Sequence, residues 1–130
     1  MNQLKGIITD ININRQLSLV TVNVSGIKLT SIILNDGSYS PMAGEETSVL
    51  FKETEVTIGL NQELGVSQQN QIPGTIVTLD KGKLLARLDI SSICGPIKAI
   101  ITANAVEQLK LEVGTKVKAL IKTNELMLSN

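Results

Sequence analysis

The chain has 130 residues, the size of one ordinary domain or of two very small ones. Hydrophobic residues make up 42% of it, yet there is no Trp, one Phe and one Tyr, so Ile, Leu and Val must fill the core. His is absent and Cys94 is the only cysteine, which excludes the usual soft-metal sites, a His-activated nucleophile and an intramolecular disulfide. Because no acid and base pair with clear spacing is present either, we expect a protein that is not an enzyme.

The sequence also predicts a cytoplasmic protein with no membrane partner. No apolar stretch approaches the roughly 18 residues that span a bilayer, and the first residues lack the pattern of a secretory signal. The zero net charge divides unevenly: residues 1–65 carry four basic and seven acidic side chains, or −3, and residues 66–130 carry eight and five, or +3. This asymmetry favours an anionic ligand in the second half or attraction between copies. The alternative is that the uneven charges lie on a solvated surface and have no functional role.

An internal repeat is the most informative pattern. The run Asn-Gln-Leu-Lys-Gly-Ile-Ile at residues 2–8 returns as Asn-Gln-Ile-Pro-Gly-Thr-Ile at residues 70–76, an offset of 68. We expect a two-residue insertion between the first pair of strands, and two lobes at residues 1–62 and 67–130. The insertion is inferred from later matches at an offset of 70, which are residues 27–28 with 97–98, Gly44 with Gly114, and Lys52 with Lys122.

Each repeat has the strand and turn pattern of a small barrel, and the branched aliphatic composition favours strands. In the first repeat, turn-forming residues at 35–41 replace the helix that the second repeat contains. The expected fold is all-β, with two tandem OB-like five-stranded barrels and a short helix in the second. In the second repeat we expect strands at 72–79, 84–90, 97–102, 115–122 and 125–129, and a helix at 103–110.

Self-association is a physical expectation. A lobe of about 60 residues buries only roughly 60% of its unfolded surface and is marginal alone. Open barrels leave edge strands, and residues 17–24 are apolar enough to pair with another copy. We therefore expect a homo-oligomer.

Several runs resemble the Mop or TOBE domain, and two such domains in one chain resemble a di-domain molbindin. That bacterial family is cytoplasmic and binds molybdate. The resemblance implies tandem OB-like lobes, a homotrimer with six lobes, and molybdate or tungstate bound at interfaces between lobes, with no redox cofactor and no metal except within the oxyanion. The matching runs are residues 2–6, residues 27–33, and residues 97–102 continuing through Leu109, Gly114 and residues 117–123.

The family holds its anion with the Ser and Arg of a Ser-Ala-Arg-Asn opening, with Thr and Ser around the helix start, and with a Lys that ends the fourth strand. Here the opening keeps Ser67 but has Gln69 for the Arg, and Ala105 stands where the family often has Ser. Amides at the helix start would add further donors. In the second repeat the resemblance implies oxyanion contacts from Ser67, Gln69, Thr102, Ala103, Asn104, Lys122 and Thr123.

The first repeat departs further from the family. Lys52 persists, the Thr position becomes Ile32 or Leu34, and Ser31 and Asn35 are the nearby polar substitutes. Lys52 and Ser31 are our candidate oxyanion contacts in the first repeat, where the binding motif matches the family poorly.

Two functions follow as hypotheses. The first is oxyanion binding for molybdenum storage or homeostasis, since converging N–H and O–H donors with modest positive charge suit a dianion. The alternative is an oligomeric structural module of the TOBE type whose anion sites have decayed. We expect no nucleic-acid partner, because two aromatic residues and zero net charge provide no stacking platform.

Overall fold

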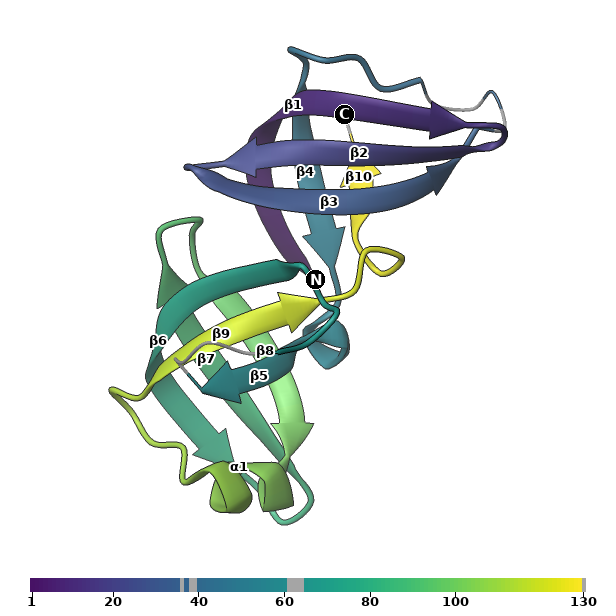
Figure 1. Cartoon of the computed structure of the whole chain (residues 1–130). Coiled ribbons are helices and arrows are strands. Elements are labelled where there is room, and N and C mark those ends of the chain that lie inside the picture. The colour runs from purple at the N-terminus through teal and green to yellow at the C-terminus, as the bar shows by residue number, and fades with distance from the viewer. Residues whose placement is uncertain (36, 38–39, 61–64, 130) are drawn as a thin grey trace.

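The computed structural model describes residues 1–35, 37, 40–60 and 65–129 and contains two five-stranded antiparallel sheets, seen one above the other in Figure 1. The N-lobe sheet has the order β10-β4-β1-β2-β3, and the C-lobe sheet has the order β5-β9-β6-β7-β8. The N-lobe strands are β1 (Asn2–Asn14), β2 (Leu17–Val24), β3 (Ile27–Leu34), β4 (Glu46–Phe51) and β10 (Met127–Ser129). The C-lobe strands are β5 (Thr57–Leu60), β6 (Asn70–Lys81), β7 (Leu85–Ser92), β8 (Ile97–Thr102) and β9 (Lys116–Ile121), with α1 (Ala103–Leu109) between β8 and β9.

The expected all-β fold with tandem OB-like barrels is confirmed, and the helix lies in the second repeat as predicted. The strands form because their sequences alternate: in β7, Ala86, Leu88 and Ile90 are buried while Arg87 between them is exposed. The cores of both lobes are aliphatic, and Phe51 is the one aromatic side chain among the buried residues that the structure describes. No helix in the described part of the chain is long and apolar enough to cross a membrane.

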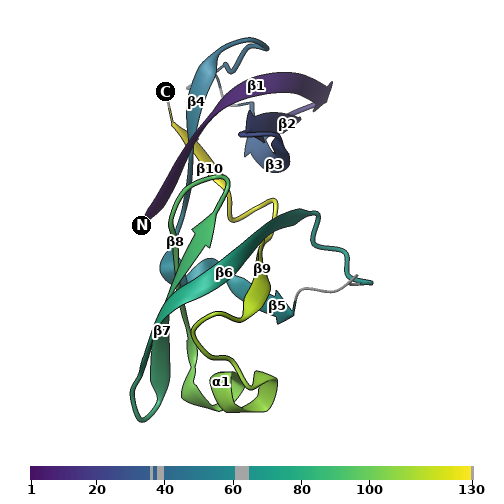
Figure 2. The same cartoon turned by 90° about the vertical axis from the view of Figure 1, so that its left-hand side faces the viewer.

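The last strand of each repeat lies in the sheet of the other lobe. β5 follows β4 along the chain yet pairs with β9, and β10 follows β9 yet pairs with β4. The chain therefore passes between the lobes at residues 52–56, the first crossover, and again at residues 122–126, the second crossover (Figure 2). The lobe limits at 1–62 and 67–130 stay a prediction, and strand pairing crosses them twice.

Two buried asparagines join the lobes reciprocally. The Asn2 side chain donates to the carbonyl of Lys98 and accepts from its N–H, each at 2.8 Å. Asn70 makes the same pair of bonds with Thr30, at 2.9 and 2.7 Å. Asn2 is equivalent to Asn70 and Thr30 to Lys98 in the strand registers, so the junction has the form of an isologous interface within one chain.

The strand registers also correct the expected place of the insertion. Leu17 pairs with Leu34 as Leu85 pairs with Thr102, so the offset of 68 continues through the third strand of each repeat. The offset becomes 70 only in the fourth strands, where Phe51 is equivalent to Ile121. The two extra residues therefore lie between β8 and β9, where α1 forms, and the expectation of an insertion between the first pair of strands was wrong.

The expectation that residues 17–24 form an exposed edge was also wrong. These residues are β2, which pairs with β1 on one side and with β3 on the other. The sheet edges are β3 and β10 in the N-lobe and β5 and β8 in the C-lobe. The local apolar pattern could not show this, because strand order is set by the whole sheet.

Removal of either asparagine clamp is expected to destabilise the protein. Asn70→Ala leaves the partly buried N–H and carbonyl of Thr30 without their partner, which should cost about 2–4 kcal/mol. Asn2→Ala should cost a similar amount. Denaturant unfolding checks both, with the exposed Asn12→Ala as a control expected within about 0.5 kcal/mol of wild type. Equal unfolding midpoints for all three variants would contradict a role for the clamps.

A second prediction concerns Gly74, where the backbone of β6 lies close to β7. A Cβ on Gly74 would lie 2.5 Å from Ile90 Cγ2 and 2.7 Å from the Ser91 carbonyl oxygen, so Gly74→Ala should cost about 1–3 kcal/mol. Gly65→Ala is the matched control, because a Cβ there meets no atom within 4 Å. Thermal unfolding compares the two, and an equally stable Gly74 variant would contradict the close approach.

Candidate functional site

A hollow of about 190 Å³ lies beside the second crossover. It brings together residues that precede β6 with residues that follow β9, because Asn70 and Ile121 pair at the adjoining ends of those strands. Four of the nine residues expected to contact an oxyanion meet here. The lining residues are Ser67, Gln68, Gln69, Lys122, Thr123 and Asn124.

The chemistry of this hollow suits a small anion. None of its lining residues is acidic, Lys122 supplies one positive charge, and Ser67 and Thr123 supply hydroxyl donors. The backbone of this segment is held in place, because the Gln71 side chain donates to the Gln68 carbonyl at 2.8 Å. The side-chain oxygen of Gln68 is buried and has no hydrogen-bond partner among the described residues.

Sequence reasoning did not select Gln68 and Asn124. Both are direct neighbours of predicted residues, Gln68 between Ser67 and Gln69 and Asn124 after Thr123. Their position next to the predicted residues was the sequence signal that could have identified them.

The second crossover is fixed against the edge strand β3 of the N-lobe. The Ile32 N–H donates to the Thr123 carbonyl at 3.1 Å, and the Ser31 hydroxyl donates to the Leu126 carbonyl at 2.6 Å. Ser31 is only 1% exposed. Its hydroxyl therefore holds the crossover in place and has no accessible surface for a ligand in this chain.

The helix start forms a separate group at the far end of the C-lobe. Thr102 is the N-cap of α1, and its hydroxyl oxygen accepts from the Ala105 N–H at 3.0 Å, which leaves the hydroxyl proton available to another acceptor. The Ala103 N–H donates to the Leu84 carbonyl at 2.8 Å and Ala103 is buried, so this amide is already satisfied. Asn104 is exposed.

The helix-start group and the hollow lie at opposite ends of β6. The hollow adjoins Asn70 at its first residue, whereas Thr102 pairs with Leu85 beyond its last residue, Lys81. The 12 residues of β6 span about 40 Å of extended chain. Figure 1 shows α1 at the end of the C-lobe away from the crossovers. One small anion cannot contact both groups within a single chain.

Lys52 occupies the place in the first crossover that Lys122 has in the second. Phe51 pairs with Asn2 as Ile121 pairs with Asn70, and the turns after both lysines close with the same 3.0 Å backbone bond, from Glu55 to Lys52 and from Glu125 to Lys122. Lys52 is exposed. The predicted equivalence of the two lysines therefore holds in their backbone positions.

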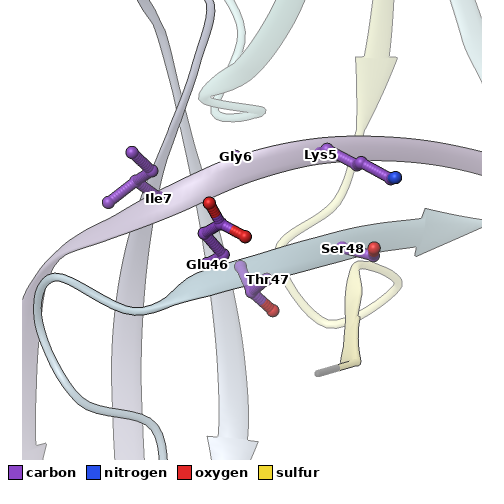
Figure 3. A pocket seen from close by; sticks show the side chains of 6 residues that line it. All are labelled: Lys5, Gly6, Ile7, Glu46, Thr47 and Ser48. Atoms are coloured by element: carbon purple, nitrogen blue, oxygen red, sulfur yellow. The ribbon is translucent and has the colours of Figure 1, made fainter.

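A larger hollow of about 460 Å³ lies over Gly6, between β1 and β4. In Figure 3 the Glu46 carboxylate lies close to Gly6, and the Lys5 side chain extends along the strand away from it. An anion here would meet a carboxylate, so its chemistry suits the predicted ligand less well than the smaller hollow. Within residues 1–35, 37, 40–60 and 65–129, no group of three or more His, Cys, Asp or Glu side chains could hold a metal ion.

Comparison with known proteins gives a consistent match. Residues 66–128 match the TOBE domain model. Molybdenum-pterin-binding protein 1 of Clostridium pasteurianum is 32% identical over 66 residues, which are 50% of this chain and 97% of that protein. The chain belongs to the molbindin family of Mop/TOBE-domain proteins. Molybdenum-pterin-binding protein 3 of the same organism is 29% identical over a stretch of the same length.

Solved structures extend the similarity in fold to both lobes. The fold is similar to that of the cytoplasmic molybdate-binding protein ModG, with a TM-score of 0.92, 24% identity, and coverage of 98% of this chain and 94% of that one. A molybdate-binding protein from Sporomusa ovata matches 52% of this chain over its full length, with 28% identity and a TM-score of 0.50. The tandem arrangement of two Mop-type lobes is therefore shown for the whole molecule.

The N-cap of α1 gives a stability prediction. Thr102→Ala removes the acceptor for the Ala105 N–H and should cost about 1 kcal/mol, while Thr102→Ser keeps a hydroxyl and should cost less. Thr54→Ala is an exposed control. Denaturant unfolding measures all three, and a Thr102→Ala variant as stable as wild type would contradict the cap.

Proposed function

We propose that the chain binds a tetrahedral oxyanion of the molybdate or tungstate type in the hollow lined by Ser67, Gln69, Lys122 and Thr123. The observation that carries the proposal is the convergence of these residues, from opposite ends of the second repeat, on a hollow without acidic lining. Amide, hydroxyl and ammonium donors are the groups that bind such dianions. The names of the molybdenum-pterin-binding and molybdate-binding relatives point to the same ligand class.

The bound anion is shared between copies of the chain in this proposal. Thr102 and Asn104 present accessible donor groups at the opposite end of the C-lobe from Lys122. An anion that contacts both groups therefore requires two chains. The functional unit is a homo-oligomer, for which we propose a trimer, and the helix start of one copy completes the hollow of another.

The physiological role that fits these properties is molybdenum storage or homeostasis in the cytoplasm. The ligand is bound through hydrogen bonds and charge, with no redox cofactor and no catalytic step. ModG is described as cytoplasmic, which supports the same location here.

A structural module with decayed anion sites is the second candidate. It is favoured by the single charged side chain of the hollow, where Gln69 stands in place of the family's arginine. Native mass spectrometry discriminates between the two. An oligomer that carries no added anion mass at micromolar molybdate supports the structural module.

Loss of the Lys122 charge tests the binding proposal. Lys122→Gln removes a charge-assisted hydrogen bond worth about 1.5–3 kcal/mol, so molybdate affinity should fall by roughly ten- to a hundredfold. Isothermal titration calorimetry measures the affinity. Lys116→Gln is the matched control, since it removes one exposed positive charge from the same lobe, at the first residue of β9, and belongs neither to the hollow nor to the helix-start group.

Thermal shifts of the wild-type protein provide the companion measurement. Molybdate and tungstate should raise the melting temperature, because a ligand that binds only the folded state stabilises it. Sulfate should stabilise the protein less. A flat response to all three anions would contradict the proposal.

A further inference from the structure

The two crossovers occupy equivalent positions in the two repeats but differ in charge. The equivalence of Lys52 with Lys122, given by the strand registers and by the matching turns, makes the next residues equivalent as well. Those residues are Glu53 in the first crossover and Thr123 in the second. A carboxylate therefore stands where the hollow has a hydroxyl donor.

The Glu53 carboxylate already has cationic partners. It lies 3.1 Å from the Met1 amino group, and its side chain is only 25% exposed. A hydrogen bond from its own backbone N–H, the amino group and the charge of Arg87 on β7 hold the pKa of Glu53 below its ordinary value. Glu53 is therefore an ionised group at neutral pH, and it lies against the C-lobe, where residues 53–55 contact β8.

One neighbour of Glu53 has the same register position as a residue of the hollow. Met1 precedes Asn2 as Gln69 precedes Asn70, so the Met1 amino group comes from the place that Gln69 has in the second repeat. The first crossover therefore contains Lys52, the Met1 amino group and the Glu53 carboxylate. The negative charge at this crossover belongs to the chain itself.

We infer that Glu53 is an internal carboxylate that takes the place of the oxyanion at the first crossover and excludes molybdate-type dianions from it. The inference rests on the proposed function, since it assigns the ligand to the second crossover alone. A fixed negative charge next to the binding position repels a dianion, and a threonine there would donate a hydrogen bond to it. Glu53 is therefore a specificity-determining residue, and the chain takes up one oxyanion at a crossover rather than two.

Exchange of the two residues tests the inference. In Glu53→Thr the first crossover acquires the residue of the second, and calorimetric titration with molybdate should detect a second class of site, up to one added equivalent per chain. In Thr123→Glu the affinity of the original site should fall by roughly tenfold or more.

Glu53→Gln is the control for charge. It removes the charge while keeping the length of the side chain, and so separates charge repulsion from the effect of lacking the threonine hydroxyl. Thermal unfolding and native mass spectrometry confirm that each variant is folded and assembled like wild type.

The outcomes separate this inference from the function on which it rests. One equivalent in wild type with a gain in Glu53→Thr supports both. One equivalent in wild type with no gain in either folded Glu53 variant, or two equivalents in wild type, overturns the inference and leaves the proposed function in place. No binding by wild type or by any variant overturns both.

Discussion

The reciprocal junction between the lobes is the constraint on which the rest of the structure depends. Each lobe obtains its fifth strand from the other repeat, and each contributes a buried asparagine whose amide is satisfied only by backbone groups of the other. Buried polar groups without partners are costly, so each half of the junction is less stable without the other. The lobes therefore stabilise each other as two subunits of a symmetric dimer would.

The same junction positions the residues that line the candidate hollow. Strand exchange creates two crossovers, and both carry the lysine that ends the fourth strand of a repeat. The second crossover is positioned by bonds from Ser31 and Ile32 of the N-lobe, so the geometry beside Lys122 depends on a strand nearly one hundred residues earlier in the chain. The equivalence of the repeats makes Glu53 and Thr123 directly comparable: the first crossover has a carboxylate where the second has a hydroxyl.

Part of the candidate site could be predicted from adjacency in the sequence. Ser67, Gln69, Lys122 and Thr123 meet in one hollow because they flank the paired ends of β6 and β9. The residue type of Ser31 could not show whether its hydroxyl is available to a ligand. In the structure this hydroxyl donates to a backbone carbonyl of the second crossover. Ala103 likewise has its amide occupied by Leu84. A donor is available to a ligand only if no nearer acceptor of the fold has taken it.

The sequence by itself determined the strands, the helix of the second repeat and the equivalence of the two lysines, because these depend on residue alternation and local turn chemistry. The tertiary structure decided strand order, the place of the two extra residues and the exchange of β5 and β10. It also decided that Asn2 and Asn70 bind across the junction. These features depend on pairing between segments far apart in the chain, and a backbone edge accepts whichever strand satisfies its hydrogen bonds, regardless of the order in which the strands occur.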